Sequence, residues 1–339
     1  MEILNMQQEI DFVITWVDGN DPEWQREFHR CKVDVGKEPV DISPTRYQDW
    51  ELLPFLFRGI ERFAPWVRTV HFVTNGQLPE WLNRSAPKLH CVSHAEFMSP
   101  ESLPTFSSHP IELQLHKIPG LAEQFVYFND DIFLLRPIEP SFFFQEGRRV
   151  DMACEERLLY LHTGIMEQIN ANNLCELNRC FPQKGLCIEQ NREKWGRHPG
   201  KGCLANHFWR RSSAFVGFSI DHLALALTKR LYETVWENCG DVLEATVRRK
   251  FRSPHDVNSW LLRYWSFASG DFCPSKELMG KYFDMKDGQN HALIKAIRQQ
   301  EYPMICANDT RRYRRFEQLK TGLQDAFEKI LPDASSFEK

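Results

Sequence analysis

The sequence predicts an α/β protein with a mostly parallel sheet and a helical C-terminal part that completes its site. Over residues 10–135, apolar runs rich in β-branched and aromatic residues alternate with segments of helical periodicity, as is typical of parallel α/β sheets. After residue 216 the longest patterns are helical. Hydrophobic residues make up 42% of the 339 residues and charged residues 26%, which is enough apolar material for a substantial core.

The N-terminal part alternates strands and helices in chain order. Each predicted strand is a short apolar run that ends in turn-forming residues, such as Asp18-Gly19 after the first and Asn75-Gly76 after the second. The first predicted helix stops before Pro65. The predicted strands cover residues 10–17, 68–74, 88–93 and 124–128, and the predicted helices cover residues 50–63 and 111–118.

The character of the sequence changes after Pro140. Residues 165–210 are rich in Asn, Cys, Arg and Gly and have weak periodicity, so we expect a variable insertion over residues 146–215. It would separate an α/β core at 1–145 from a C-terminal part at 216–339 that packs on the same core. The C-terminal part is predicted to contain helices at 223–238, 257–266 and 316–330 and a strand at 302–307.

Charge and composition exclude several classes of protein. The formal net charge is −4, whereas proteins that coat duplexes usually carry a basic excess, so no nucleic-acid partner is expected. Residues 1–11 contain no apolar run typical of a secretory signal, and no stretch approaches the roughly 18–20 apolar residues that cross a bilayer. The ten cysteines lack the short spacing of a disulfide framework. We therefore expect a cytoplasmic protein with reduced thiols.

Acidic residues follow three of the predicted strands. They are Asp18 after the first strand, Asp130 with Asp131 after the fourth, and Asp309 beside Asn308 after the last. Ligands of open α/β sheets bind at the carboxyl ends of strands, and Mg²⁺ or Mn²⁺ prefers carboxylates together with substrate phosphates. The arrangement resembles the Asp-x-Asp motif of nucleotide-sugar transferases, so a GT-A or Rossmann-like nucleotide-sugar-binding core is expected. The alternative is that these residues only form turns and helix caps.

Arginine and histidine side chains could supply phosphate binding and proton transfer, which a site for phosphate chemistry needs in addition to a metal. His109 and Glu112 lie three residues apart on a predicted helix and share one face, and a neutral imidazole can take a proton from a hydroxyl. Arg252 lies in a predicted turn, and its guanidinium is suited to bidentate phosphate binding. Structural roles, as a buried histidine or a surface arginine paired with an acid, remain the alternatives.

The sequence resembles the Stealth protein family, in order, over nearly the whole chain. The run Asp11-Phe-Val-Ile-Thr-Trp-Val-Asp-Gly-Asn-Asp-Pro22 resembles the first block of that family. His222, followed by Lys250-Phe-Arg252 and Asp256, resembles the third block. Cys306-Ala-Asn-Asp309, together with residues 332–338, resembles the fourth. Four segments resemble the second block, at residues 58–67, 103–112, 116–120 and 127–131.

The resemblance implies a sugar-1-phosphate transferase of capsular or cell-surface polysaccharide biosynthesis. Such an enzyme would use Mg²⁺ or Mn²⁺ and move hexose-1-phosphate, or N-acetylhexosamine-1-phosphate, from a UDP-sugar to a sugar hydroxyl. It would form a phosphodiester and release UMP. The acceptor would be an oligosaccharide or a lipid-linked saccharide, which leaves peripheral association with the inner face of the cell membrane open.

The resemblance also implies roles for individual residues. Two departures from the family pattern stand out: Gln48-Asp-Trp-Glu-Leu-Leu-Pro-Phe55 replaces a more polar motif, and Leu-Ala-Leu-Ala follows His222 where relatives have prolines. The expected catalytic residues are His222, Arg252, Glu112 and His109; the expected donor-binding residues are Asp18, Asn129, Asp130 and Lys250; the expected metal ligands are Asp131, Asp309 and Asn308.

Two other functions remain open from the sequence. A metal-dependent glycosyltransferase would keep the fold but break the anomeric bond and release UDP. A carbohydrate-binding subunit without catalytic activity would require no metal.

Overall fold

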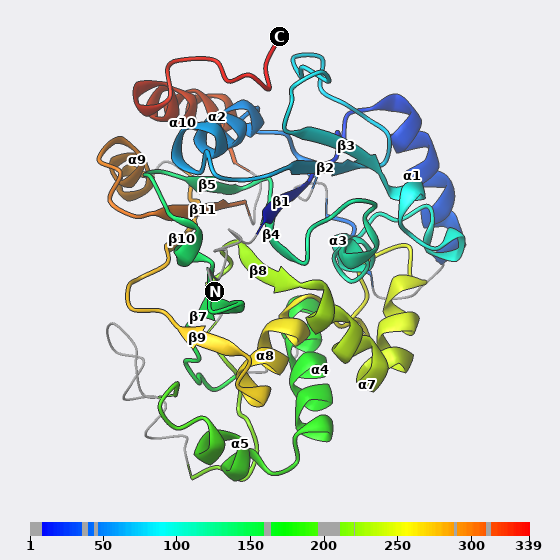
Figure 1. Ribbon diagram of the computed structural model, residues 1–339. Coiled ribbons are helices and arrows are strands. Elements are labelled where there is room, and N and C mark those ends of the chain that lie inside the picture. Colours follow the sequence, from blue (N-terminus) through cyan, green and yellow to red (C-terminus); the bar gives the residue numbers. More distant parts are fainter. Residues whose placement is uncertain are drawn as a thin grey trace.

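The computed structural model describes residues 9–35, 40–43, 47–158, 164–195, 211–219, 221–287, 290–309 and 313–339 (Figure 1). The strands are β1 Ile10–Thr15, β2 Val70–Thr74, β3 Leu89–Ser93, β4 Gln124–Asn129, β5 Ile132–Leu134, β6 Phe144–Gln145, β7 Arg148–Asp151, β8 Leu225–Thr228, β9 Phe272–Pro274, β10 Lys281–Asp284 and β11 Met304–Asn308. The helices are α1 Pro22–Val35, α2 Leu53–Phe63, α3 Ser108–Glu112, α4 Ile165–Cys180, α5 Lys184–Gln190, α7 Lys229–Val247, α8 Trp260–Ser269, α9 His291–Arg298 and α10 Phe316–Ile330.

The central sheet runs in the order β3-β2-β1-β4-β8, and its first four strands are parallel. From β1 the chain passes to β2 and β3 on one side and then to β4 on the other. The strand order therefore reverses between β1 and β4, which is where open α/β sheets form a crevice for ligands. The predicted α/β fold class with a mostly parallel sheet is confirmed.

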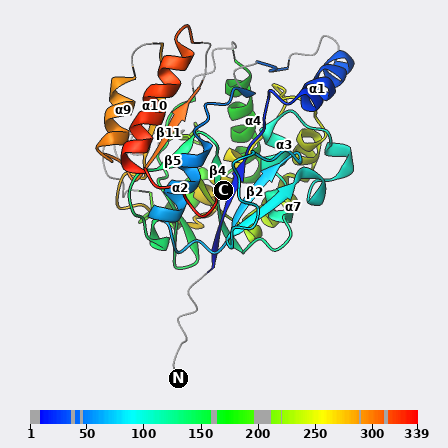
Figure 2. The ribbon, with the colours of Figure 1, turned by 90° about the horizontal axis from the view of Figure 1, so that it is seen from above.

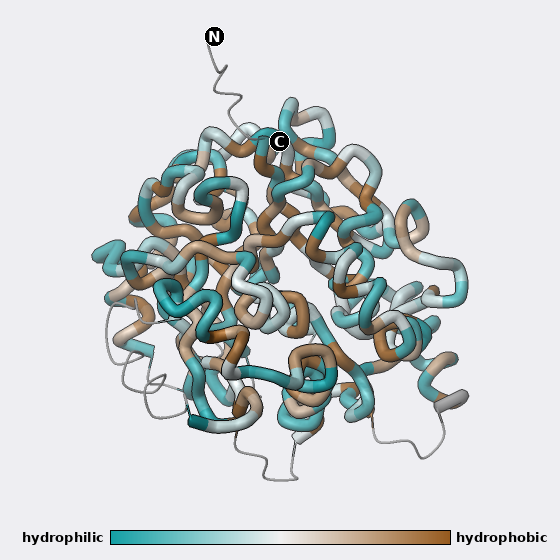
Figure 3. The backbone as a smooth tube through the Cα atoms, turned by 60° about the horizontal axis from the view of Figure 1, so that its bottom comes forward, coloured by the Kyte–Doolittle hydropathy of each residue, from teal (hydrophilic) through white to brown (hydrophobic). Residues whose placement is uncertain are grey.

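Helices cover both faces of the central sheet. Phe12 of β1 belongs to the apolar cluster that includes α2 and α10, whereas its neighbour Val13 belongs to the cluster that includes α7 and α8. This alternation follows from the period of two along a strand. Seen from above, α9 and α10 lie on one side of the molecule and α1 on the other (Figure 2), and hydrophobic stretches run through the interior (Figure 3).

Two pieces of the C-terminal part join the N-terminal part by strand pairing. β8 adds to β4 in the antiparallel direction, and β11 lies between β10 and β5 in a second sheet. A third small sheet has the order β6-β7-β9. The division of the chain at residues 145 and 215 stays a prediction, and residues 196–210 of the expected insertion lie outside the described residues.

Two predicted elements were wrong in detail. The predicted helix at 223–238 begins with strand β8, because Leu225-Ala-Leu is buried against β4 and the Thr228 side chain accepts a hydrogen bond from Leu231 N, 3.1 Å away, and so caps α7. The predicted helix at 111–118 is instead the end of α3 followed by a short 3₁₀ turn at Leu115–Lys117. Within the described residues, no helix is long and apolar enough to cross a membrane.

Asp11 ties the amino-terminal ends of the central strands together. It is fully buried on β1, and its carboxylate accepts hydrogen bonds from Arg68, from His71 at 3.0 Å and from the backbone N–H of Ala122 at 2.7 Å. Burial by itself would raise the pKa of Asp11, but these donors lower it to about 2.

We expect Asp11→Asn to lower the free energy of unfolding by about 2–4 kcal/mol at pH 7, because the buried donors lose their charged acceptor. The pKa of such a carboxyl is lower in the folded protein than in the unfolded chain. The group therefore stabilises the fold fully at pH values above its pKa in the unfolded chain. This stabilisation is lost as the pH falls through its pKa in the folded protein. The difference between variant and wild type should therefore shrink as the pH falls from about 4 towards 2. Urea unfolding of both proteins at several pH values measures this difference in the free energy of unfolding.

Glu9→Gln is the matched control for this prediction. Glu9 contacts the same guanidinium at 3.2 Å but is 67% exposed, so its loss should cost no more than about 0.5 kcal/mol. Equal losses for the two variants would contradict the anchoring role of Asp11.

Candidate active site

A cavity of about 890 Å³ opens at the carboxyl ends of β1 and β4. This volume suits a nucleotide-sized ligand. The strand register places Thr15 beside Asn129, so the segments that follow both strands enter the cavity together. The polar residues that line it include Thr15, Asp49, Ser108, His109, Glu112, Asn129, Asp130, Asp131, His222, Arg252, Asn308 and Asp309.

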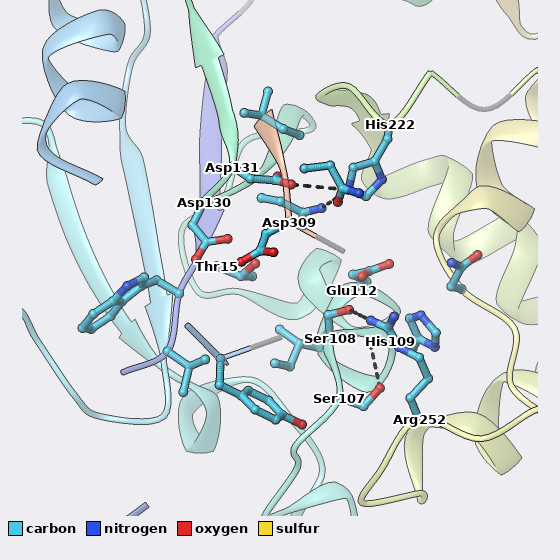
Figure 4. A pocket seen from close by; sticks show the side chains of 18 of the residues that line it. Thr15, Ser107, Ser108, His109, Glu112, Asp130, Asp131, His222, Arg252 and Asp309 are labelled. Carbon is cyan, nitrogen blue, oxygen red and sulfur yellow. Dashed lines mark hydrogen bonds and ion pairs between the residues drawn. The ribbon is translucent and has the colours of Figure 1, made fainter. Parts of the chain in front are cut away.

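The carboxylates of the first half of the chain meet those of the last part through backbone pairing. Ala307 N donates to the carbonyl of Asp131 at 2.9 Å, and Cys306 pairs with Ile132 in the antiparallel ladder between β11 and β5. Asp309 therefore lies at the same end of the cavity as Asp130 and Asp131 (Figure 4). The three carboxylates form what we call the acidic cluster.

Asp131 is held by the Cys306 thiol and lies near the His222 imidazole. The Cys306 thiol donates to Asp131 Oδ2 at 3.3 Å, and His222 Nε2 lies 3.8 Å from the same oxygen. Burial and the nearby carboxylate of Asp131 raise the pKa of Cys306 well above its usual value, so the group is a thiol at neutral pH. Asp131 Oδ1 is buried, and no donor among the described residues reaches it.

Asp130 and Asn308 complete this end of the cavity. Asp130 is exposed to the cavity, yet the surrounding walls remove much of its water; this loss of hydration and the nearby Asp131 and Asp49 raise its pKa to about 7. The amide nitrogen of Asn308 donates to the Tyr282 hydroxyl at 2.6 Å, which orients the amide. Crowded oxygen groups of this kind suit a hard divalent cation.

His222 is fixed at the side of the cavity by its backbone and by Asn129. Its φ of 42° lies in the left-handed region, which a non-glycine residue keeps only when its surroundings hold it. Arg263 donates to the carbonyl of Ser219 at 2.6 Å and so anchors the segment before it. The Asn129 amide nitrogen lies 3.4 Å from His222 Nε2.

The Asn129 contact indicates which tautomer His222 adopts. The Tyr127 hydroxyl donates to Asn129 Oδ1 at 2.5 Å and lies 3.1 Å from Thr15 Oγ1. With its oxygen occupied in this way, Asn129 presents its N–H₂ group to His222, so Nε2 acts as an acceptor. An imidazole nitrogen with a lone pair in the cavity can take a proton from a hydroxyl.

The opposite wall is built on α3. Ser107 caps this short helix, which presents His109 and Glu112 to the cavity. Glu112 Oε2 accepts a hydrogen bond from Ser259 Oγ at 2.6 Å. Burial would raise the pKa of Glu112, but hydrogen bonds from Ser259 and Ser108 and the charge of Arg252 lower it on balance. It is therefore a buried carboxylate.

Arg252 is the cation of this wall. Its guanidinium donates to Ser108 Oγ at 3.2 Å and contacts Met166 of α4 at 3.3 Å, and its carbonyl accepts from Asp41 N at 3.0 Å. Burial, and then the charge of Arg252, lower the pKa of His109. His109 is thus a neutral imidazole, and its Nδ1 lies 3.4 Å from Asp256.

The structure brings nine of the eleven predicted site residues to one cavity. The two that do not line it are Asp18, whose backbone N–H donates to Gln77 Oε1 at 2.9 Å, and Lys250. The Lys250 ammonium donates to the carbonyls of Glu101 and Leu103, at 2.8 and 2.6 Å.

Sequence reasoning missed several residues that shape the site. Trp50 donates to Asp309 Oδ2 at 2.8 Å, Tyr127 orients Asn129, and Cys306 binds Asp131. In the sequence, Trp50 and Tyr127 look like ordinary core aromatics. Only the position of Cys306, three residues before Asp309, could have drawn attention to it.

Comparison with known proteins identifies the family. Two family models match: Stealth protein conserved region 1 over residues 8–32 and Stealth protein conserved region 2 over residues 46–151. The receptor polysaccharide phosphotransferase WefC of Streptococcus oralis is 35% identical over 97% of this chain and 99% of its own length. The capsular polysaccharide phosphotransferase WcwK of Streptococcus pneumoniae is 34% identical over 98% and 100%.

The chain belongs to the Stealth protein family, and the prediction of a transferase enzyme of this family is confirmed. The resemblance of the third and fourth blocks stays a prediction. Among solved structures, a galactosyltransferase, LgtC, in complex with donor and acceptor sugar analogs matches over 96% of both chains, with 9% identity and a TM-score of 0.39.

The position of Lys250 generates a prediction. Lys250→Met should lower the free energy of unfolding by about 1–3 kcal/mol, because two carbonyls lose a charged donor. Turnover by the folded variant should stay close to that of the wild type, since the ammonium does not line the cavity. Thermal unfolding and steady-state assays test both parts. Turnover lost without any loss of stability would return Lys250 to the donor-binding residues.

Proposed function

We propose that this protein transfers hexose-1-phosphate, or N-acetylhexosamine-1-phosphate, from a UDP-sugar to a sugar hydroxyl and releases UMP. The product is a phosphodiester in a capsular or cell-surface polysaccharide. The observation that carries the proposal is the placement of Asp131, Asp309 and Arg252 around one cavity at the carboxyl ends of the strands. The named phosphotransferases that it resembles over almost their whole length support the reaction class.

The acidic cluster fits a divalent cation, Mg²⁺ or Mn²⁺. Asp131 Oδ1 is buried without a donor among the described residues, and a buried carboxylate oxygen without a donor is costly unless a ligand satisfies it. Asp131, His222 and Cys306 also place one ligand atom each within 4.8 Å of one another. Because Mg²⁺ and Mn²⁺ prefer oxygen ligands to a thiol, we assign the cation to Asp131 and Asp309, with Asn308 in support.

When bound, such a cation neutralises charge on the diphosphate. Phosphate binding and proton transfer are carried out by side chains of this protein. Arg252 binds the β-phosphate, where negative charge develops, and the Ser108 contact holds the guanidinium at the cavity wall. His222 Nε2 accepts the proton of the acceptor hydroxyl. The acceptor oxygen forms a bond to the β-phosphorus as the bond from that phosphorus to the bridging oxygen breaks, and UMP leaves with the bridging oxygen.

His109 and Glu112 are the alternative bases, and their placement also suits a second role. Both lie on the wall beside Arg252, and a carboxylate and a neutral imidazole are well suited to binding sugar hydroxyls. Asn129 and Asp130 take part in binding the donor from the opposite side. Asp18 is the weakest of the proposed donor-binding residues, because its side chain lies outside the cavity lining.

The acceptor in this proposal is an oligosaccharide or a lipid-linked saccharide, and the reaction takes place in the cytoplasm, with peripheral association at the inner face of the membrane. The second candidate function is a metal-dependent glycosyltransferase that releases UDP. The crowded acidic cluster alone would serve both reactions. The phosphotransferase relatives favour the first.

Product analysis tests the proposed reaction. Incubation of the purified protein with a panel of UDP-sugars, Mn²⁺ and saccharide acceptors should release UMP and give a phosphodiester signal in ³¹P NMR. The expected dependence on Mn²⁺ or Mg²⁺ follows from the acidic cluster. Release of UDP without a diester would establish the glycosyltransferase instead.

Arg252→Ala should reduce turnover by roughly 10²–10³-fold, because the variant loses the charge that stabilises the transition state. Arg248→Ala is the matched control: Arg248 is an exposed arginine four residues earlier that pairs with Glu244 at 2.8 Å on α7. Its turnover should equal that of the wild type. Near-normal turnover by folded Arg252→Ala would remove this residue from the mechanism.

A further inference from the structure

We propose that Trp50 is a positioning residue that orients the Asp309 carboxylate for the divalent cation. The inference rests on the proposed function, since it presupposes a cation at the acidic cluster. It concerns a residue that comes just before α2 and lies 259 positions from the carboxylate it binds. Neither the sequence pattern nor the cavity lining by itself assigns it this role.

The hydrogen bond between the two residues is well formed. Trp50 Nε1 donates to Asp309 Oδ2 at 2.8 Å, which lies in the range of a charge-assisted bond. An indole has one N–H and no acceptor, so the direction of this bond is not ambiguous. A donor on one carboxylate oxygen limits rotation of the whole group and thereby sets the direction of both oxygens.

The indole is itself held by aromatic packing. Its ring centroid lies 4.6 Å from that of Phe316 on α10 and 5.3 Å from that of Tyr313, which it meets edge to face. The Tyr313 hydroxyl in turn donates to the carbonyl of Met285 at 3.2 Å. Trp50 is therefore held by Tyr313 and Phe316, which follow Asp309 in the sequence.

The chemistry of an indole suits this task. A lysine or arginine at the same place would orient the carboxylate but would also cancel the negative charge that attracts a cation. An indole N–H orients Asp309 while leaving its charge in place. Partners that hold a metal ligand in this way typically change metal affinity by roughly 10–100-fold when they are removed.

The test measures Mn²⁺ binding without turnover, by titration followed by electron paramagnetic resonance. Trp50→Phe keeps an aromatic ring and removes the N–H, so Mn²⁺ should bind roughly 10–100-fold more weakly than in the wild type. Trp236→Phe is the matched control, because Trp236 Nε1 donates to the carbonyl of Leu113 at 3.0 Å outside the cavity lining. Its Mn²⁺ affinity should be unchanged.

Trp50→His restores a ring N–H and should recover part of the affinity. Wild-type affinity in folded Trp50→Phe would overturn the proposal, as would equal losses in Trp50→Phe and Trp50→His, since the ring shape rather than the N–H would then matter. Asp131→Asn provides the reference in which binding is lost. If the wild type binds Mn²⁺ no better than Asp131→Asn, the proposed function fails, and the inference fails with it.

A measurement on the wild type covers the case in which Trp50→Phe does not fold. In ¹⁵N-labelled protein, one indole N–H resonance should shift on addition of Mg²⁺, and Trp50→His identifies it by its disappearance. The same resonance should stay in place when Mg²⁺ is added to Asp131→Asn. If the Trp50 resonance does not move in the wild type at saturating Mg²⁺, the proposal is overturned.

Discussion

The site depends on one backbone pairing, the short antiparallel ladder between β5 and β11. The hydrogen bond from Ala307 N to the carbonyl of Asp131, at 2.9 Å, brings the end of β11 against the turn that follows β4. The pairing partners are far apart in the chain, so closing this loop costs conformational entropy that the packing of α2, α9 and α10 must offset. This pairing of β5 with β11 is what places Asp309 near Asp131.

The buried carboxylates Asp11 and Asp151 differ from the acidic cluster in the donors that hold them. Asp11 and Asp151 are buried and are bound by guanidinium groups, from Arg68 in one case and from Arg263 in the other. Such pairs support the fold. In the acidic cluster, the Cys306 thiol donates to Asp131 and the Trp50 indole donates to Asp309. Each of these donors orients a carboxylate oxygen and is itself uncharged.

Much of the fold could be predicted because its signals are local. The strand at 124–128, the helix at 316–330 and the acidic residues after strands are all legible in short windows of sequence. The prediction failed at 223–228, where a run of Leu and Ala suits a helix as well as a strand, and only pairing with β4 decides between them. It also failed at residues 111–118, where α3 ends at Glu112 and a 3₁₀ turn follows at Leu115–Lys117.

The sequence by itself determined the class of fold, the family and the chemical types of the groups at the site, because each of these follows from residue identity and short-range spacing. Tertiary structure alone decided which of those groups share a cavity. In the folded protein, Arg252 lies in the same cavity as the acidic cluster. The Lys250 ammonium donates to two backbone carbonyls, and the Trp50 indole donates to Asp309. The physical reason is that strand register and side-chain packing act between residues hundreds of positions apart, and no local pattern in the sequence records them.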